Sequence, residues 1–428
     1  MIKDFFDFIE SSPSAAHTVA AIKERLLKQG FQEISENERW ELEEGGRYFT
    51  TRNRTSILAF KFPGKKFNAF SIVAPHSDSP NFKVKTAPEI RVNEAYTRLN
   101  TEVYGGMQLG LWLDRPLSVA GKLAVAAENG IETVLTDIKR DLLVIPSLAI
   151  HLNREVNKGI ELNPQNDTLP LFGGSEADLL ELAAQSAGVK KEAVVSYDLY
   201  LYNRMRGCVF GADNEFIAAP KLDDLECVYT SLSAFLEAEN ESNCMVLAVF
   251  DNEEIGSLTR QGADSTFLYD CISRICLISG KDEEERIMVI QGGFMLSADN
   301  AHALHPNYPQ KSDSTNKCLL NGGVVIKHST RYTTEAFTAA VFKKLCDRAG
   351  VLTQTYFNNS RLPGGSTLGN ISNAQVSLNA VDIGMAQWAM HSPYESAGAR
   401  DIKYMTEAVK YFYKSRIVML KDGKAEFL

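Results

Sequence analysis

The sequence predicts an α/β fold in which helices cover a mostly buried sheet, with a second, β-rich domain inserted into it. Short apolar runs alternate with segments whose apolar residues recur at helical spacing, and this alternation is typical of helices packed on a sheet. Between residues 88 and 212 the alternation gives way to short β-rich runs and turn signals such as Gly105-Gly106, and it resumes after residue 212. That change of pattern predicts the insertion.

The expected helices and strands follow one another along the chain. The first helix is expected over 14–30, where apolar residues share one face, Ser14 can cap the start and Gly30 can end it. Strands are expected in the apolar runs at 56–60, 69–74, 245–250, 287–291, 324–326, 352–357 and 375–381. Helices are expected at 225–237, 334–349 and 401–416, and a short acid-rich helix near Ser175.

Length and pattern together predict two domains. A chain of 428 residues is long enough for two or three domains of ordinary size. Because the α/β pattern is interrupted and then resumes, we expect residues 1–87 and 213–428 to form one discontinuous domain. Residues 88–212 are expected to form the inserted domain.

Composition excludes several classes of protein and partner. Apolar residues make up 44% of the chain and charged residues 23%, as in ordinary globular proteins. The formal charge is 45 − 54 = −9, and this sign disfavours phosphate backbones and anionic lipid heads. The sequence therefore predicts neither a nucleic acid nor a membrane surface as a partner.

The N-terminus and the cysteines indicate a cytoplasmic protein. Residues 1–7 include two acids and no sustained apolar run, unlike a secretory signal. No apolar run approaches the roughly 18 residues that span a bilayer. The seven cysteines are odd in number and form no Cys-x-x-Cys pair, so we expect reduced, mostly buried thiols.

Metal-ligand residue types follow two of the expected strands. The run at 69–74 leads into His76 and Asp78, and the run at 245–250 leads into Asp251, Glu253 and Glu254. Ligands of open α/β sheets bind outside the carboxyl ends of the strands. Either loop alone is equally well explained as a capped turn or a solvated loop, but the two together favour a site.

Further segments carry similar side chains. Asp223 and Asp224 open an expected helix, where simple N-capping is the alternative. The segment 297–306 is rich in polar groups, and His391 precedes a proline turn. The glycine-rich loop 363–369 lacks the Gly-Lys-Ser/Thr ending of a phosphate-binding loop.

In this order the motifs resemble those of the aspartyl aminopeptidase family, and of its bacterial branch in particular. The likeness covers nearly the whole chain. Its motifs are His76-Ser-Asp-Ser-Pro80, Leu222-Asp-Asp224, Asp251-Asn-Glu-Glu-Ile-Gly-Ser257, Asp299-Asn-Ala-His-Ala-Leu-His-Pro-Asn-Tyr308 and Met390-His-Ser392, with Trp112-Leu-Asp-Arg-Pro-Leu117 and Pro146-Ser-Leu-Ala-Ile-His-Leu-Asn-Arg154 in the middle region. The resemblance implies a mixed-sheet, three-layer metallo-exopeptidase domain with an inserted dimerisation or lid domain.

The resemblance also implies a centre with two divalent metal ions, most often zinc, with manganese or cobalt as alternatives. His76 and Asp299 would hold one ion and Glu254 and His391 the other, while Asp223 would bridge the two. A bridging carboxylate suits two ions held at about 3.5–4 Å. Asp78 would fix the ring of His76, and Glu253 would act as the general base.

Other residues receive roles from the same resemblance. In related enzymes a histidine at the position of His151 reaches the active site of a neighbouring subunit, within a homo-oligomer that is a dodecamer built from dimers. Lys327 at a strand end is a candidate contact for an acidic substrate side chain. His302 and Gly365 are candidate contacts in the substrate pocket, with local hydrogen bonding as the alternative for His302.

The activity that the resemblance implies is removal of the N-terminal residue from peptides. Acidic residues, Asp or Glu, are the preference that the family name implies, and neutral residues stay open. A carboxypeptidase or deacylase of the same fold is one alternative, although the motif around His151 is not expected in it. A non-catalytic oligomeric scaffold is the other, although it predicts a missing ligand and none is missing.

Overall fold

The computed structural model describes residues 1–362, 364–365 and 367–428. Its largest element is a nine-stranded mixed sheet in the order β1-β2-β3-β13-β4-β14-β18-β16-β17. The strands in that spatial order are β1 (Gln32–Glu33), β2 (Arg47–Arg52), β3 (Ser56–Lys61), β13 (Asn243–Val249), β4 (Ala69–Ala74), β14 (Phe294–Ala298), β18 (Asn379–Gly384), β16 (Val324–His328) and β17 (Thr353–Phe357).

The middle of this sheet is parallel. Strands β13, β4, β14 and β18 pair in parallel. At the two borders of this parallel block, β3 runs antiparallel to β13 and β16 runs antiparallel to β18. All residues of β3, β4, β13 and β14 are buried, as expected for strands covered on both faces. The carboxyl ends of the four parallel strands therefore meet at one edge of the sheet.

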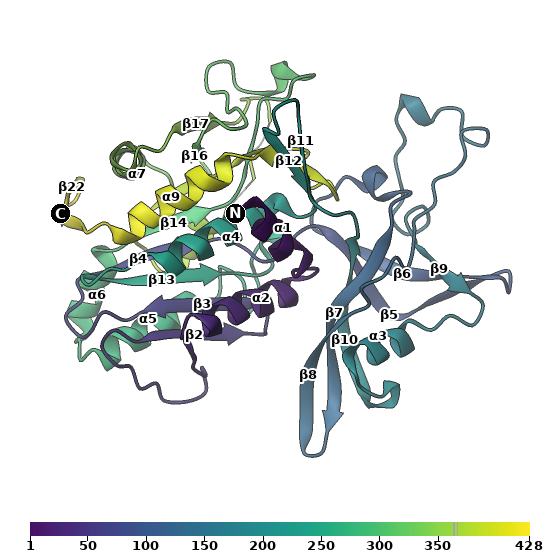
Figure 1. Cartoon of the computed structure of the whole chain (residues 1–428), viewed down its shortest axis with the longest axis horizontal. Helices are drawn as coiled ribbons and strands as arrows, with labels where there is room; N and C mark the ends of the chain where they lie inside the picture. Colours follow the sequence, from purple (N-terminus) through teal and green to yellow (C-terminus); the bar gives the residue numbers. More distant parts are fainter. Residues whose placement is uncertain (363, 366) are drawn as a thin grey trace.

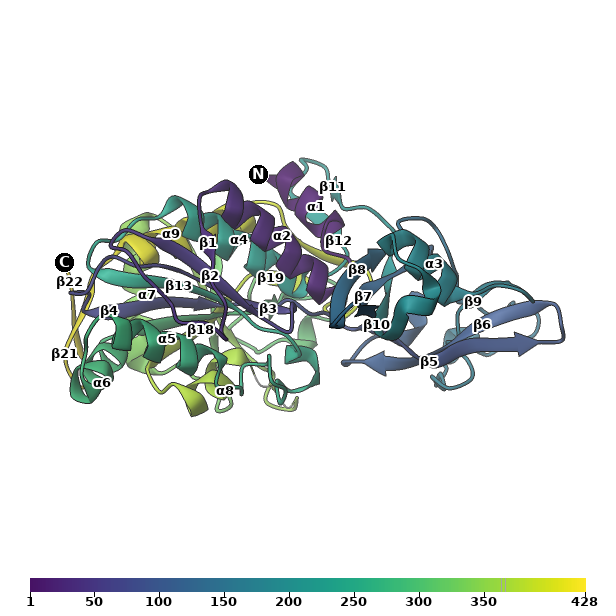
Figure 2. The same cartoon turned by 90° about the horizontal axis from the view of Figure 1, so that it is seen from below.

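Helices cover both faces of the sheet, so the domain has three layers (Figures 1 and 2). One face packs against helices that share a single hydrophobic cluster, namely α1 (Ile2–Glu10), α2 (Ala15–Lys28), α4 (Leu222–Glu237), α7 (Ala336–Ala349) and α9 (Asp401–Lys414). The other face packs against a second cluster that includes side chains of α5 (Phe267–Ile278), α6 (Glu283–Gln291) and α8 (Leu368–Gln375).

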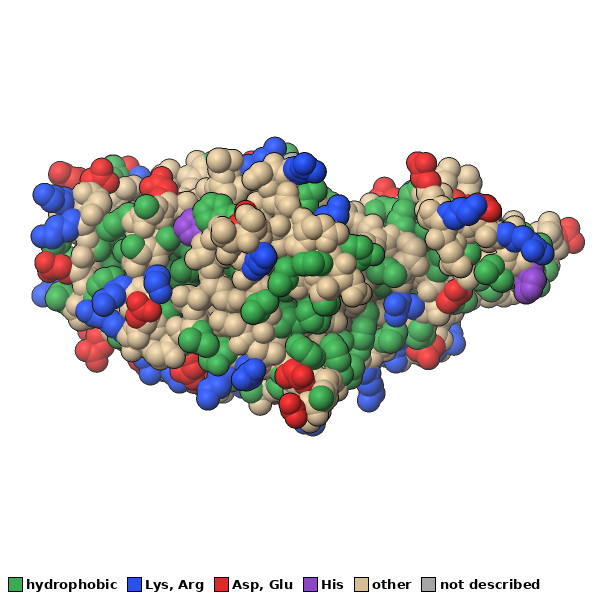
Figure 3. All heavy atoms as spheres, turned by 90° about the horizontal axis from the view of Figure 1, so that it is seen from above, with side chains coloured by type: hydrophobic (Ala, Val, Ile, Leu, Met, Phe, Trp, Pro, Cys, Tyr) green, Lys and Arg blue, Asp and Glu red, His purple; other side chains and the backbone are tan. Residues whose placement is uncertain are grey.

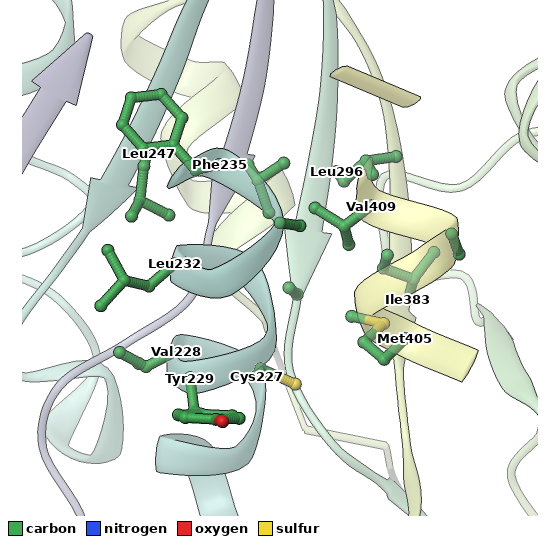
Figure 4. Packing of buried hydrophobic residues seen from close by; sticks show 14 of the residues in the cluster. Cys227, Val228, Tyr229, Leu232, Phe235, Leu247, Leu296, Ile383, Met405 and Val409 are labelled. Atoms are coloured by element: carbon green, nitrogen blue, oxygen red, sulfur yellow. The ribbon is translucent and has the colours of Figure 1, made fainter. Parts of the chain in front are cut away.

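Figure 4 shows how α4 packs in the first of these clusters. Leu232 and Phe235 of α4 lie beside Leu247 of β13, while Met405 and Val409 of α9 pack nearby. Alternate residues of one strand serve opposite faces, since Leu247 belongs to the first cluster and Val246 to the second. This packing fixes the position of the start of α4 relative to the sheet, and so the position of Asp223.

A six-stranded antiparallel sheet forms the narrower end of the molecule, to the right in Figures 1 and 2. Its order is β8-β7-β10-β5-β6-β9, and α3 (Leu179–Ala187) packs with it in a separate hydrophobic cluster. The strands in that order are β8 (Gly130–Asp137), β7 (Leu117–Ala127), β10 (Val194–Asn203), β5 (Asn81–Val92), β6 (Tyr96–Tyr104) and β9 (Leu171–Gly174). The β-rich middle of the chain thus forms its own sheet, while the division at residues 88 and 212 stays a prediction.

Smaller sheets complete the fold. A five-stranded sheet has the order β11-β12-β20-β19-β15, and a two-stranded sheet ends the chain. The strands are β11 (Cys208–Phe210), β12 (Phe216–Ala219), β20 (Glu395–Gly398), β19 (Ala386–Trp388) and β15 (Ala301–His302), followed by β21 (Ile417–Lys421) and β22 (Lys424–Phe427). Within the described ranges, no helix combines the length and apolarity needed to cross a membrane.

Most of the expected elements are present, with one reversal of type. The run at 287–291 is not a strand: it is the last part of helix α6. The reason lies just before the run, where Asp282 and Glu285 form a capping box and three glutamates occupy the first turn. Ser14 is the N-cap of α2 as expected, but its hydroxyl bonds to the His17 ring, 2.9 Å away, and not to the helix backbone.

Candidate metal centre

The loops that follow the parallel strands bring acidic and imidazole side chains together. His76 follows β4, and an isolated parallel bridge between His76 and Phe250 carries the β4–β13 pairing past the strand ends. Glu253 and Glu254 follow Phe250 closely, in the 3-10 helix η4 (Glu253–Ile255). Asp299 follows β14 directly. Each ligand type therefore stands where the sheet geometry predicts.

Asp223 enters the cluster from a different element, the start of α4. Its peptide bond to Asp224 is cis, and both residues have non-helical backbone angles before the regular helix begins. Both carboxylates are buried, and neither follows the helical path. The pair therefore does more than cap a helix: both carboxylates belong to one group of ligand atoms with His76 and Asp299.

The two oxygens of Asp223 face two different histidines. Oδ1 lies 3.3 Å from Nε2 of His76, and Oδ2 lies 3.4 Å from Nε2 of His391. Nε2 of His391 is also 3.3 Å from Oε2 of Glu254, while Nε2 of His76 is 3.9 Å from Oδ1 of Asp299. One carboxylate thus joins two clusters of ligand atoms.

These clusters have the composition of metal sites. The candidate ligand atoms of each group lie within 4.8 Å of one another, and the groups are His76-Asp223-Asp224-Asp299, Asp223-Glu254-His391 and His76-Glu253-Glu254. Asp223 is shared by the first two groups. All five residues expected as metal ligands lie together here.

Charge also accumulates at this point. Burial opposes ionisation of both histidine rings, yet Asp224 and Asp223 raise the pKa of His76 well above its ordinary value. Asp223 likewise raises the pKa of His391 to about 9 against the effect of burial. The two rings in turn hold the pKa of Asp223 below its usual range although it is buried. The cluster thus attracts positive charge.

Asp78 lies behind His76 and orders the loops around it. Nδ1 of His76 lies 3.2 Å from the backbone oxygen of Asp78 and 3.4 Å from its Oδ1, so the ring turns Nε2 toward the cluster. The backbone N–H groups of Glu253 and Glu254 donate to the two carboxylate oxygens of Asp78, each at 3.2 Å. Asp78 thus contacts three residues of the cluster at once.

Glu253 is half-buried beside the cluster. Burial raises the pKa of its carboxyl to about 8, and the negative charges of Asp299 and Asp78 act in the same direction. It belongs to one ligand group with His76 and Glu254. This placement suits a group that exchanges protons at neutral pH.

The residues expected to contact substrate have different surroundings. Lys327 is 3% exposed, and its ammonium donates to Asp299 Oδ2 at 2.9 Å and to the backbone oxygens of Asp299 and Asn300 at 3.0 Å. All three of its protons are used within the protein. This geometry gives no support to contact with an acidic substrate, and it makes Lys327 a support for Asp299.

His302 and Gly365 are both exposed. His302 lies in β15, with its ring centroid 6.3 Å from that of Tyr356. No atom lies within 4 Å of the place where a Cβ on Gly365 would stand. Pro363 and Ser366, in the same glycine-rich loop, fall outside the described residues.

His151 lies apart from the metal cluster, in the exposed segment between β8 and β9. That segment extends outward from the second sheet (Figure 1). Neighbouring apolar side chains are also open to solvent, with Leu148 58%, Ile150 53% and Leu152 75% exposed. Figure 3 shows hydrophobic side chains at the surface of this narrow end of the molecule.

Sequence reasoning missed several residues that hold the site. Glu395 is 2% exposed and accepts the backbone N–H groups of His391 and Asp223 at 2.7 and 3.0 Å. Tyr104 donates to Asp78 at 2.7 Å, and Asp224 accepts the backbone N–H of His76 at 3.0 Å. Two of these residues, Asp224 and Glu395, lie close to expected ligands in the sequence, and this closeness is the signal that could have indicated them.

The chain is similar to known aminopeptidases over nearly its full length. Residues 8–413 match the family described as "Aminopeptidase I zinc metalloprotease (M18)". The "Probable M18 family aminopeptidase 2" of Clostridium acetobutylicum is 43% identical over 425 residues, covering 96% of this chain and 98% of that protein. The protein of the same name from Pseudomonas aeruginosa UCBPP-PA14 is 38% identical over 422 residues, with 96% and 97% covered.

Solved structures agree with this likeness. A cryo-EM structure of the Ape4 and Nbr1 complex has a chain that matches with a TM-score of 0.92 and 34% identity, covering 96% of this chain and 84% of that one. The S. cerevisiae mApe1 dodecamer matches with a TM-score of 0.85 and 26% identity, covering 96% and 95%. The expected fold class and activity are confirmed: the chain belongs to the M18 family of zinc metallo-aminopeptidases.

Proposed function

We propose that this aminopeptidase works with two divalent metal ions, with zinc as the native metal. His76, Asp223 and Asp299 would hold one ion, and Asp223, Glu254 and His391 the other. The observation that carries the proposal is the orientation of Asp223, whose two oxygens face His76 and His391 separately at 3.3 and 3.4 Å.

Unsatisfied buried atoms support this assignment. Among the described residues, Asp223 Oδ1, Asp224 Oδ1 and Glu254 Oε1 are buried without a hydrogen-bond partner. Buried carboxylate oxygens are costly unless they are paired or bind a cation. The mixture of imidazole nitrogen and carboxylate oxygen is the donor set of catalytic zinc sites. When bound, such ions lower the pKa of water and polarise a peptide carbonyl.

The chain's own residues would move the protons. Glu253 takes a proton from the attacking water at its carboxylate and delivers it to the nitrogen of the leaving amine as the peptide bond breaks. Asp78 keeps the His76 ring turned and holds the backbone of Glu253 in place.

We also propose that His151 acts on the active site of a neighbouring subunit. Its exposure and that of the nearby apolar side chains support this role, because a segment rich in exposed Leu and Ile favours a protein partner. The S. cerevisiae relative forms a dodecamer, and we propose the same homo-oligomer, built from dimers through the second sheet. There His151 would donate a hydrogen bond to the oxyanion.

The substrates would be peptides with a free N-terminus, including those that begin with Asp or Glu. We propose the cytoplasm as the compartment, and the seven free cysteines, six of them buried, fit its reducing conditions. Glutamates and aspartates crowd the cluster, so a free N-terminal ammonium group is attracted to it.

An activity panel tests this function. The metal-free protein is loaded with zinc, manganese or cobalt and given the 4-nitroanilides of aspartate, glutamate and leucine, with N-acetyl-leucine nitroanilide as the matched control. We expect nitroaniline release from at least one free amine substrate, none from the acetylated one, and complete loss with a chelator. Release of nitroaniline from the acetylated substrate would show that a free amine is not required and would contradict an aminopeptidase. Formation of leucine nitroanilide from it would favour a deacylase, and no cleavage of any substrate would favour a scaffold.

A further inference from the structure

The end of strand β6 leaves the second sheet and enters the metal centre of the same chain. Tyr104 is the last residue of β6, and the turn after it runs through Gly105 and Gly106 to Gln108. Nothing in the role of an oligomerisation domain requires this approach.

Tyr104 makes the shortest hydrogen bond to Asp78. Its hydroxyl donates to Asp78 Oδ2 at 2.7 Å, while the backbone N–H groups that reach this carboxylate lie at 3.2 Å. The same hydroxyl accepts from the side-chain amide of Asn252 at 2.8 Å. Tyr104 is 8% exposed, so neither partner has ready access to bulk water in its place.

Asn252 extends this network into the glutamate loop. Its side-chain oxygen accepts from Thr259 and Gln261, each at 2.8 Å, and it directly precedes Glu253 in the chain. One hydroxyl from the second sheet is thus bonded to the residue that orients His76 and to the residue that precedes the general base.

The glycine turn contacts the opposite side of the cluster. The backbone of Gln108 donates to the carbonyl of His391 at 3.3 Å, and a backbone hydrogen bond joins Gly106 to the His391 ring. A Cβ on Gly105 would stand 3.1 Å from Cβ of Glu254. The turn therefore packs closely against two of the proposed ligands, and glycine permits that approach.

We propose that Tyr104 is a positioning residue of the metal centre, which acts through Asp78 and makes the second sheet a structural part of its own chain's active site. The inference rests on the proposed two-metal function. Removing the hydroxyl would leave Asp78 and Asn252 each without a partner in a buried place, and both would relax toward new partners. His76 and the Glu253–Glu254 backbone would then lose their fixed positions.

The chain offers a matched control in Tyr200 on the adjacent strand β10. Its ring lies 5.8 Å from that of Tyr104, edge to face. Within the described part of the chain its hydroxyl has no hydrogen-bond partner. Tyr104→Phe and Tyr200→Phe therefore remove the same atom from neighbouring rings, and only the first removes a bond to Asp78.

The experiment measures metal affinity by competition with a chelator, together with kcat and KM on a nitroanilide substrate. For Tyr104→Phe we expect metal affinity or kcat to fall about 10- to 100-fold, as is usual for residues behind metal ligands, with KM nearly unchanged. Tyr200→Phe should match the wild type in all three. Equal behaviour of the two variants, with wild-type metal affinity and kcat in both, would overturn the proposal.

A double-mutant comparison distinguishes a specific effect of Tyr104→Phe from a general loss of folding. In the Asp78→Ala background the Tyr104 hydroxyl keeps only its bond to Asn252, so adding Tyr104→Phe should lower metal affinity much less than it does in the wild type, whereas equal losses in both backgrounds would contradict action through Asp78. Metal binding by the wild type distinguishes failure of the proposed function from failure of the Tyr104 inference. If it binds no metal, the proposed function fails; if it binds two ions and Tyr104→Phe keeps both the wild-type metal affinity and the wild-type kcat, only this inference fails.

Discussion

At the scale of single residues, the contacts of the buried Lys327 ammonium indicate that it holds Asp299 in place. Its three donors all bond to Asp299 or Asn300. We therefore expect Lys327→Met to weaken metal binding about 10- to 100-fold and to lower kcat equally for acidic and neutral substrates. The measurement is chelator competition together with kcat and KM for the aspartyl and leucyl nitroanilides.

The control for Lys327 is an exposed lysine of similar length. Lys343→Met on α7 removes only a surface pair with Asp347 and should leave both properties unchanged. If Lys327→Met instead raised KM for the aspartyl substrate alone, with metal binding intact, the ammonium would be a substrate contact and our assignment would be wrong.

His17 makes a residue-scale prediction about pH. Burial lowers the pKa of its ring from 6.5 to about 4. Between pH 6.5 and pH 4 the ring is therefore protonated in the unfolded chain and neutral in the folded chain. Stability contributed by the neutral ring is therefore full above pH 6.5 and is lost as the pH falls toward 4. Urea midpoints at pH 7.5 and 5 should fall more for the wild type than for His17→Gln, and equal falls would contradict the assignment.

At the scale of elements, the ends of β14 and β18 depend on close backbone contact. A Cβ on Gly384, the last residue of β18, would stand 2.0 Å from the carbonyl oxygen of Asp299. Gly384→Ala should thus push Asp299 away, cost about 1–3 kcal/mol or more in the free energy of unfolding, and weaken metal binding. Urea unfolding and chelator competition measure the two effects.

A turn glycine provides the comparison for Gly384. Nothing lies within 4 Å of a Cβ on Gly130, at the start of β8, so Gly130→Ala should change neither stability nor metal binding appreciably. If Gly384→Ala behaved in the same way, the contact between β18 and Asp299 would not be needed to place this ligand.

Most elements could be predicted because their apolar patterns are local properties of the sequence. Strand β4 occupies 69–74 as expected, and α7 and α9 begin within two residues of the predicted starts. The run at 287–291 resembles a strand because four of its five residues are apolar, while the signals for a helix, Asp282 and Glu285, lie before it. Short apolar runs cannot be assigned without their flanks.

The residues of the candidate site likewise fall into those that a local pattern predicts and those that only tertiary contacts reveal. Residues of metal-ligand type at strand ends could be predicted, because the parallel strands converge at one edge. Tyr104 could not, since its role depends on a tertiary contact with a residue 26 positions away. Glu395 lies near His391 in the sequence, but its bond to the backbone of Asp223, 172 positions away, has no local signal. No local pattern marks a tyrosine at the end of one sheet as a partner for an aspartate beside another.

At the scale of the whole molecule, the proposed action of His151 in a neighbouring subunit makes a prediction about mixed oligomers. His151→Ala and Glu253→Gln chains should each be nearly inactive alone, with the first losing about 10²–10³-fold in kcat. Coexpressed chains with different tags should recover activity, because a His151→Ala chain keeps Glu253 and can receive His151 from its partner. Under random pairing one site in four is complete.

The mixed oligomer must be purified through both tags before its kcat is measured. Activity no greater than the sum of the two separate variants would show that His151 serves only its own chain or no site at all. A wild-type chain that stays monomeric at working concentration and is fully active would contradict the proposed homo-oligomer as well.

The central claim is that Glu253 moves the proton at a site built from His76, Asp223, Glu254, Asp299 and His391. Glu253→Gln keeps the size of the side chain and removes its basicity, so the most direct measurement is kcat together with the metal content of the same sample. We predict two ions per chain, as in the wild type, with kcat lower by about 10²–10⁴-fold. Aminopeptidase activity retained at the wild-type rate with both ions bound would contradict the account.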